Sequence, residues 1–236
     1  MKTIGKTRNV IYWVIGLLLT SLSVAFSTKS NFGLSTATPY ILHVWLRDRF
    51  PWFTQGTAEY VWQTLMLIAL CIVIKRFKWK YLLSFATAVV CGYVLDGWFL
   101  LLGGNGPYES IGMRIAAYVI CLILAGIGVP FLYRTTMPIQ MYELSVTEFC
   151  DRYKKDKPKI KLFFDIIMLA IAISLSLLLT KKLTGIGPGT IITAFLVAPL
   201  IKIFGTILDK VTGMTPAPED APAESDAAED AGETEE

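Results

Sequence analysis

Six stretches of mainly apolar residues, each about as long as a bilayer is thick, limit how this chain can fold more than any other feature. A helix needs about 20 mainly apolar residues to cross the hydrocarbon core. The stretches lie near residues 9–28, 57–75, 81–102, 114–133, 162–180 and 188–208. They are too long, and too apolar on every side, for barrel strands, whereas a helix satisfies its own backbone hydrogen bonds in lipid. The sequence therefore predicts an all-α polytopic membrane protein with about six transmembrane helices and the lipid bilayer as its first partner.

The distribution of Lys and Arg predicts the orientation of these spans. Of the 22 basic residues, 15 fall on the side of the N-terminus and 6 on the other, with Lys202 inside a span. Because cytoplasmic segments carry the excess of positive charge, both termini are expected in the cytoplasm. The expected location is the bacterial plasma (inner) membrane, crossed several times.

The two halves of the chain repeat each other at a spacing of about 106 residues. Charged residues in corresponding places pair as Arg8 with Arg114, Lys29 with Arg134, Lys75-Arg76 with Lys181-Lys182, and Asp96 with Lys202. Each half holds three spans, and because three is an odd number, the second half must enter the bilayer inverted relative to the first. The sequence therefore predicts two inverted three-helix repeats, about 1–105 and 106–213, with a site between them, as in many secondary transporters.

The C-terminal segment differs in composition from the rest of the chain. Residues 214–236 contain nine acidic residues, no basic ones, and repeated Ala and Pro. Such a segment cannot bury enough apolar surface to offset the entropy of ordering it. We therefore expect a transmembrane domain over 1–213 and a disordered acidic tail over 214–236.

Two connections between spans carry the pattern of short amphipathic helices. One lies in the segment 31–50 and the other in 137–153, and each follows a Gly or Pro break. An interfacial helix that rests among lipid headgroups explains such a pattern. A partly re-entrant helix, whose broken end faces a cavity, explains it equally well.

A glycine-rich string opens the sixth predicted span. It runs from Leu183 to Thr190 and contains Gly185, Gly187 and Gly189. The helix after it starts with free N–H groups, which could hold an anionic group. The simpler interpretation is a tight loop with Thr190 as the helix cap, because the string lacks the ending of a phosphate-binding loop.

Charged residues within the predicted spans are candidates for function because burying a charge in lipid is costly. Asp96 lies in the outer part of the third span and could bind a proton, a cation or a cationic substrate group; the alternative is a position at the interface. Lys202 lies nearer the inner face and can extend its long side chain toward the cytoplasm. The candidate pathway residues are Asp96, Gly33, Ser35, Gly185, Gly187, Gly189, Thr190 and Lys202.

Several functional classes lack their usual sequence signals. The four cysteines form no CxxC pair, and a single histidine, His43, excludes a multi-histidine metal site. The chain carries no HExxH or GxSxG motif. We therefore expect no catalytic residues, no metal, no cofactor and no nucleic-acid partner.

Two groups of motifs resemble a known family. They are Asn31-Phe32-Gly33-Leu34-Ser35 after the first span, and Gly185-Ile186-Gly187-Pro188-Gly189-Thr190 through Ala198-Pro199-Leu200-Ile201 at the sixth. This combination resembles the YczE/YitT-type family of bacterial integral membrane proteins over residues 1 to about 210. The resemblance implies a multi-pass plasma-membrane protein, and it supplies no functional residues to carry over.

These observations favour a small secondary transporter or exporter that moves a small solute or ion by alternating access. The alternative is a non-catalytic membrane subunit or regulator that binds a partner, such as an energising ATPase module. Either function is compatible with a homo-oligomer or with a partner subunit.

Overall fold

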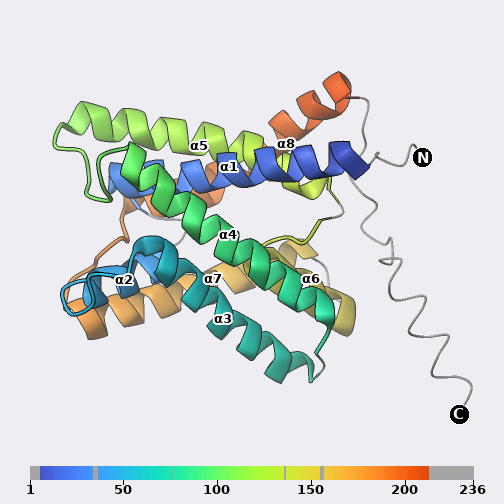
Figure 1. Ribbon diagram of the computed structural model, residues 1–236, viewed down its shortest axis with the longest axis horizontal. Helices are drawn as coiled ribbons and strands as arrows, with labels where there is room; N and C mark the ends of the chain where they lie inside the picture. The colour runs from blue at the N-terminus through green and yellow to red at the C-terminus, as the bar shows by residue number, and fades with distance from the viewer. Residues whose placement is uncertain (1–5, 34–36, 76, 136, 155–156, 213–236) are drawn as a thin grey trace, which may run out of the picture.

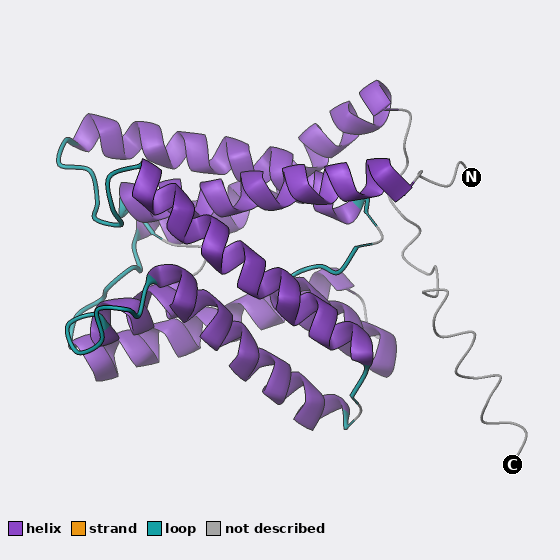
Figure 2. Ribbon diagram, viewed as in Figure 1, coloured by secondary structure: helices purple, strands orange, loops and turns teal. Residues whose placement is uncertain are grey.

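The computed structural model describes residues 6–33, 37–75, 77–135, 137–154 and 157–212, and all regular structure within these ranges is helical (Figure 2). The helices are, in chain order, α1 (Lys6–Ser30), α2 (Ala37–Leu46), α3 (Gln55–Ile74), α4 (Trp79–Leu101), α5 (Ile111–Tyr133), α6 (Met141–Tyr153), α7 (Lys157–Leu175), the π-helical turn η1 (Ser176–Thr180) and α8 (Pro188–Thr212). The acidic tail predicted over 214–236 lies outside the described residues.

Each of the six predicted spans falls on a long helix. Five helical stretches are long and apolar enough to cross a membrane: Thr7–Ser30, Gln55–Ile74, Tyr81–Leu101, Ile111–Tyr133 and Phe163–Thr180. The sixth predicted span, 188–208, corresponds to α8, a 25-residue helix that is not among these five and has several side chains outside the described part of the chain. The short helices predicted between the spans are confirmed as α2 and α6.

Large apolar side chains cover the outside of the bundle. Leu100 of α4 is 84% exposed, Leu178 of η1 is 75% exposed, and Val211 of α8 is 79% exposed. Water would solvate such a surface poorly, whereas lipid chains cover it without penalty. The length of the helices and this surface together indicate a multi-pass protein in contact with the lipid bilayer.

The helices form two groups that α4 joins (Figure 1). The first group contains α1, α5 and α8, with α5 packed against both others. The second contains α2, α3, α6 and α7 with η1. Among the described residues, α4 is the helix that packs against members of both groups, since it contacts α1 on one side and α3 and α6 on the other. We call the end of the bundle where α1 begins the N-terminal face, and the opposite end the distal face.

The second half of the chain repeats the element order of the first. A long helix, a short helix and two further long helices make up α1–α4, and the same order recurs in α5–α8. Several contacts recur as well: α1 with α4 corresponds to α5 with α8, and α2 with α7 corresponds to α6 with α3. Two contacts do not recur. Helix α4 contacts α6, whereas the corresponding helices α8 and α2 do not pack on each other in the described part of the chain. Helix α3 packs closely on α4, whereas α7 and α8 do not pack on each other in the described part of the chain.

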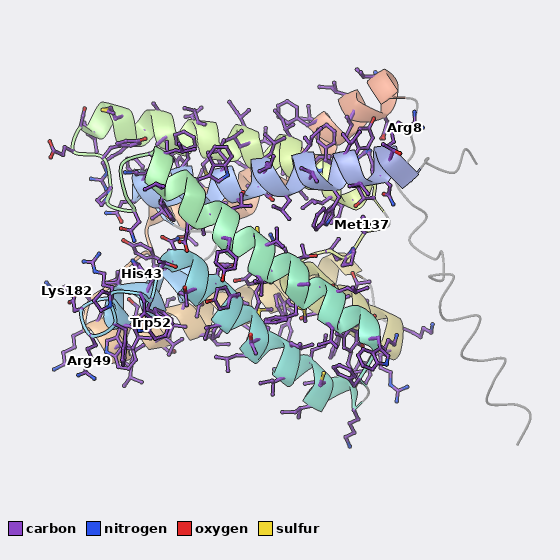
Figure 3. All side chains as sticks on the ribbon, viewed as in Figure 1. Arg8, His43, Arg49, Trp52, Met137 and Lys182 are labelled. Atoms are coloured by element: carbon purple, nitrogen blue, oxygen red, sulfur yellow. The ribbon has the colours of Figure 1, made fainter. Side chains whose placement is uncertain are left out.

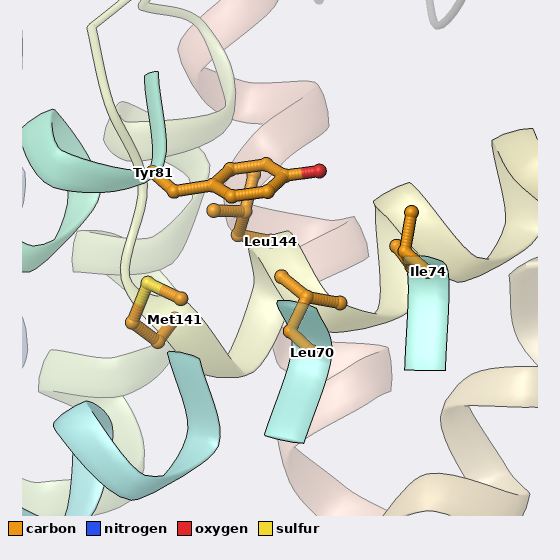
Figure 4. Close-up of a cluster of buried hydrophobic side chains, with 5 residues drawn as sticks. All are labelled: Leu70, Ile74, Tyr81, Met141 and Leu144. Carbon is orange, nitrogen blue, oxygen red and sulfur yellow. The ribbon is translucent and has the colours of Figure 1, made fainter. Parts of the chain in front are cut away.

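Two glycines allow the close contact between α3 and α4. A Cβ atom added at Gly56 of α3 would overlap the carbonyl oxygen of Gly92 of α4, and one added at Gly92 would lie 2.7 Å from the Gly56 carbonyl oxygen. Small residues at such crossings let helix backbones approach each other in membrane proteins. Nearer the N-terminal face, an apolar cluster joins α3, α4 and α6 (Figure 4); its members are Leu70, Ile74, Tyr81, Met141 and Leu144.

The glycine crossing predicts a difference between two Gly→Ala variants. Gly56→Ala should push α3 away from α4 and lower the free energy of unfolding by about 1–3 kcal/mol, as overpacking does. Gly97→Ala on α4 is the matched control, because a Cβ atom there meets nothing within 4 Å. Since Ala favours helix by about 1 kcal/mol over Gly, the control should be as stable as the parent protein or more stable. Thermal unfolding in detergent, followed by tryptophan fluorescence, measures both; equal shifts would contradict this role of the crossing.

Candidate functional site

The short helix α6 begins deep inside the bundle. Its first N–H group, on Met141, donates a hydrogen bond of 3.1 Å to Oε1 of Gln63. Gln63 lies eight residues into α3, which places the start of α6 about 12 Å along that helix. At its other end α6 reaches the N-terminal face, where the Tyr153 hydroxyl donates to the Val73 carbonyl oxygen at 3.4 Å. The helix therefore starts in the interior and runs outward alongside α3.

The segment before α6 turns back into the bundle after α5 ends. The Pro138 carbonyl oxygen accepts hydrogen bonds from Trp13 Nε1 of α1 at 3.2 Å and from the Thr87 hydroxyl of α4 at 3.3 Å. Both donors lie about 10–12 Å along their helices from the N-terminal face. The segment before α6 therefore lies inside the helix bundle; the choice between a re-entrant and an interfacial helix for 137–153 stays a prediction.

The short helix α2 mirrors this arrangement from the distal face. Ala37 and Ile41 pack with Ala172 of α7, which lies eight residues before the end of η1. The end of α2 reaches the distal face, where His43, Arg49 and Trp52 lie near Lys182 (Figure 3). The N-terminal ends of α2 and α6 therefore both lie in the interior and approach it from opposite faces.

One face of α3 carries a buried stripe of polar side chains, Gln55, Glu59 and Gln63, which we call the α3 stripe. The three residues are spaced four apart, so they lie on one side of the helix, and at most 5% of each is exposed. Gln55 Nε2 donates to the Thr28 hydroxyl of α1 at 3.0 Å, and Gln63 Nε2 donates to Glu59 Oε1 at 3.2 Å. The stripe thus connects α1 with the start of α6 through the interior.

The hydrogen bonds around the stripe determine how both amides are oriented. The Thr28 hydroxyl already donates to the Val24 carbonyl oxygen, so it accepts from the NH₂ group of Gln55 and leaves Gln55 Oε1 free. Gln63 Oε1 accepts the Met141 N–H, so its NH₂ group faces Glu59.

Three buried polar atoms around the stripe have no hydrogen-bond partner among the described residues. They are Gln55 Oε1, Glu59 Oε2 and the hydroxyl oxygen of Tyr142 on α6. Tyr142 faces the Glu59 carboxylate, but the two groups do not make a hydrogen bond of normal geometry. Buried polar groups are nearly always satisfied, so three such atoms around one carboxylate mark a candidate binding site.

Sequence reasoning did not include the α3 stripe among the candidate residues, although a signal was present. Glu59 is a carboxylate within the predicted span 57–75, with Gln four residues before it and four residues after it. That spacing places all three on one face of a helix, and a polar face within lipid must be turned toward protein or water. The same rule that singled out Asp96 therefore applied to Glu59.

The structure brings four of the candidate pathway residues together: Gly33, Gly187, Gly189 and Thr190. The Gly189 N–H donates to the Phe32 carbonyl oxygen at 2.8 Å. A Cβ atom at Gly33 would overlap Thr190, and Gly33 has a φ of 146°, which side chains disfavour. The end of α1 therefore docks on the start of α8 through backbone atoms, with Phe32 supplying the carbonyl that meets the first turn of α8.

A groove that is open to the outside lies beside this junction. Its volume is about 250 Å³, and it is lined by Phe32, Ile115, Tyr118, Gly189 and Ile192. The hydroxyl of Tyr118 is turned to the Gly189 carbonyl oxygen at 2.7 Å and to the Thr193 hydroxyl at 2.8 Å. The lining is therefore apolar and suits a hydrocarbon chain better than a polar solute.

Asp96 of α4 packs against the N-terminus of α3. Its carboxylate accepts from the Thr54 hydroxyl at 2.5 Å and from the Gly56 N–H at 2.9 Å. Thr54 is the N-cap of α3 and also accepts from the Thr57 N–H. A carboxylate at this end of a helix is stabilised by its free N–H groups. This arrangement gives Asp96 a structural role; a role in a transport pathway stays a prediction.

The remaining candidate residues are Lys202, Gly185 and Ser35. Lys202 is exposed on α8. Gly185 lies in the loop between η1 and α8 with a φ of 73°. Ser35 falls outside the described residues.

His43, near the end of α2, takes part in a hydrogen-bond network at the distal face. Burial lowers the pKa of its imidazole, and nearby Arg47 acts in the same direction, against the Phe53 carbonyl and Asp96. The neutral ring fits its contacts, because Nδ1 donates to the Phe53 carbonyl oxygen at 2.8 Å while Nε2 accepts from the Asn105 amide. This network holds α2, the loop before α3 and the loop after α4 together.

The capping role of Asp96 predicts a loss of stability when its charge is removed. Asp96→Asn should lower the free energy of unfolding by about 1–2 kcal/mol, as loss of a charged helix cap does. Asp48→Asn is the matched control, because Asp48 is 84% exposed and pairs with the neighbouring Arg47, which is itself exposed. Thermal unfolding in detergent should show a lower midpoint for the Asp96 variant alone, and an unchanged midpoint would remove the cap from this account.

The fold and the buried polar interior define a multi-pass integral membrane protein. The chain belongs to a family of unknown function, DUF6198, whose model matches residues 7–206. The curated "Uncharacterized protein YyaS" of Bacillus subtilis (strain 168) is 26% identical over 203 residues, which cover 85% of this chain and 94% of that protein. No solved structure matches the chain. These matches do not carry the YczE/YitT name, so that resemblance stays a prediction.

Proposed function

We propose that the protein is a small secondary transporter that moves a small solute across the plasma membrane by alternating access. The observation that carries this proposal is the difference between two corresponding contacts. Helix α3 packs on α4, whereas the corresponding helices α7 and α8 are apart in the described part of the chain. In carriers built from inverted repeats, the two halves hold unequal conformations, and exchange of these conformations opens the site to the other side.

Other features agree with two inverted halves. The element order repeats, α1 and α5 form the most extensive contact, and α2 and α6 enter the interior from opposite faces. Broken or short helices whose N-terminal ends point to the middle of the bilayer surround the substrate sites of several transporter folds. We place both termini in the cytoplasm of a bacterial cell, in line with the likeness to the YczE/YitT-type proteins. The α3 stripe would then lie between the two faces of the membrane, where a substrate site is expected.

The proposed exchange involves the two helix groups as separate bodies. Arg134, just after α5, binds Asp209 of α8 at 2.6 Å and the Gly205 carbonyl oxygen at 2.8 Å. These bonds hold α8 to α5, so the second group moves relative to both. In the alternative state α7 approaches α8, and α3 separates from α4.

Pulsed electron–electron double resonance, which measures the distance between two spin labels, tests this exchange in liposomes. Labels at Ile72 and Leu83 report on α3–α4, and labels at Leu178 and Ile192 report on α7–α8; all four side chains are exposed. We expect two populations of label-to-label distances for each pair. In the state with the shorter α7–α8 distance, the axes of these two helices should be about 8–10 Å apart, as in packed helices. Conditions that increase the short α7–α8 distance should increase the long α3–α4 distance.

A third pair of labels serves as the control. Leu18 of α1 and Ile123 of α5 are exposed residues on helices that stay packed in both proposed states. This pair should give one distance under all conditions. A single, unchanging distance for all three pairs would contradict alternating access and favour a static membrane subunit.

A further inference from the structure

Glu59 is a buried carboxyl group with no positively charged side chain paired to it in the described part of the chain. The ion pairs there join Arg47 with Asp48, Lys78 with Glu148, and Arg134 with Asp209. A carboxylate buried in this way is strongly disfavoured unless it gains a proton or a cationic partner. The start of α6 supplies only a partial positive charge, which reaches Glu59 through the Gln63 amide.

The free atoms around Glu59 indicate what kind of partner fits. Gln55 Oε1 and Glu59 Oε2 are hydrogen-bond acceptors that lie one turn apart on the same face of α3, and the Tyr142 hydroxyl adds an oxygen from α6. One negative charge and two free acceptors complement a ligand with one positive charge and at least two N–H donors.

We propose that Glu59, Gln55 and Tyr142 form a binding site for a small organic cation with N–H donors, a protonated amine or a guanidinium group. This inference names the substrate class of the transporter proposed above and rests on that proposal only for the movement of the ligand. In the absence of the cation, a proton neutralises Glu59. When the cation binds, the O–H bond of the carboxyl group breaks, the proton leaves to water, and the carboxylate accepts N–H hydrogen bonds from the ligand. One positive charge replaces another, so the exchange of cation for proton is electroneutral.

Other titratable groups near Glu59 do not supply this charge. Cys91 of α4 and Tyr142 of α6 face the carboxylate, and both are neutral in their ordinary forms. On α2, His43 is engaged by the Phe53 carbonyl oxygen and Asn105. On α1, Lys29 lies over the Tyr108 ring at 5.0 Å, toward the distal face.

Binding to the purified full-length protein in detergent tests the site without any transport step. The probes are guanidinium and methylammonium at millimolar concentration, with tetramethylammonium, Na⁺ and K⁺ as comparison cations. Tetramethylammonium has the same charge as methylammonium but no N–H donor. Binding is read from the shift in the thermal unfolding midpoint and from proton release into a weakly buffered solution that contains a pH dye.

Guanidinium and methylammonium should raise the midpoint and release protons, and tetramethylammonium should do neither. Glu59→Gln keeps the shape of the side chain but removes the charge; it should weaken binding by at least about tenfold and abolish proton release. Glu109→Gln, at an exposed loop position, is the matched control and should behave as the parent protein does. Tyr142→Phe should weaken binding about three- to tenfold while keeping proton release.

Binding to Glu59→Gln with unchanged affinity would overturn the proposal, as would equal binding of tetramethylammonium or tighter binding of Na⁺ or K⁺. Proteoliposomes loaded with a pH dye then separate this inference from the proposed function. Cation binding without guanidinium-driven proton flux would leave the site standing and contradict the transporter. Exchange of the spin-label distances without cation binding would support the transporter and overturn this substrate class.

Discussion

The close crossing of α3 and α4 determines where the other parts of the interior lie. Gly56 and Gly92 let the two backbones touch, and Asp96, one turn further along α4, binds the first turn of α3. Glu59 follows Gly56 by three residues and Cys91 precedes Gly92, so the crossing also sets the buried carboxylate against α4. Because α4 is the helix that contacts both groups in the described residues, a looser crossing would change the relation between the groups as well as the stability of α3.

The same helix explains why the two halves differ. Helix α4 starts next to α6, where Lys78 and Tyr81 bind Glu148 at 3.1 and 2.9 Å, and it ends against α1. Helix α8 instead runs along α5 from Tyr118 to Arg134 and stays within the first group. In the function that we propose, the second conformation exchanges these two crossings, so that α7 packs on α8 and α3 leaves α4.

Hydropathy was sufficient to predict the helices, because lipid leaves a long apolar segment few alternatives to a helix. The short helix predicted within 137–153 is α6 (Met141–Tyr153), and the glycine string at 185–190 does form a tight backbone junction. The partners of these elements could not be predicted. The carboxylate of Asp96 caps a helix that begins 41 residues earlier in the sequence, and the Phe32 carbonyl oxygen meets Gly189 from the other half of the chain. The α3 stripe could be recognised from its spacing, but the three free oxygens depend on Thr28 and Met141, which only the tertiary fold brings there.

The proposed exchange of cation for proton requires that the Glu59 carboxyl group is protonated when the interior is empty and ionised when a cation is bound. Infrared difference spectroscopy of the protein in lipid observes this directly, since the C=O stretch of a carboxylic acid is distinct from the stretches of a carboxylate. On addition of guanidinium, the account predicts loss of one carboxylic-acid band and gain of carboxylate bands in the parent protein, and no such change in Glu59→Gln. A parent spectrum without that conversion, or the same conversion in the variant, would contradict it.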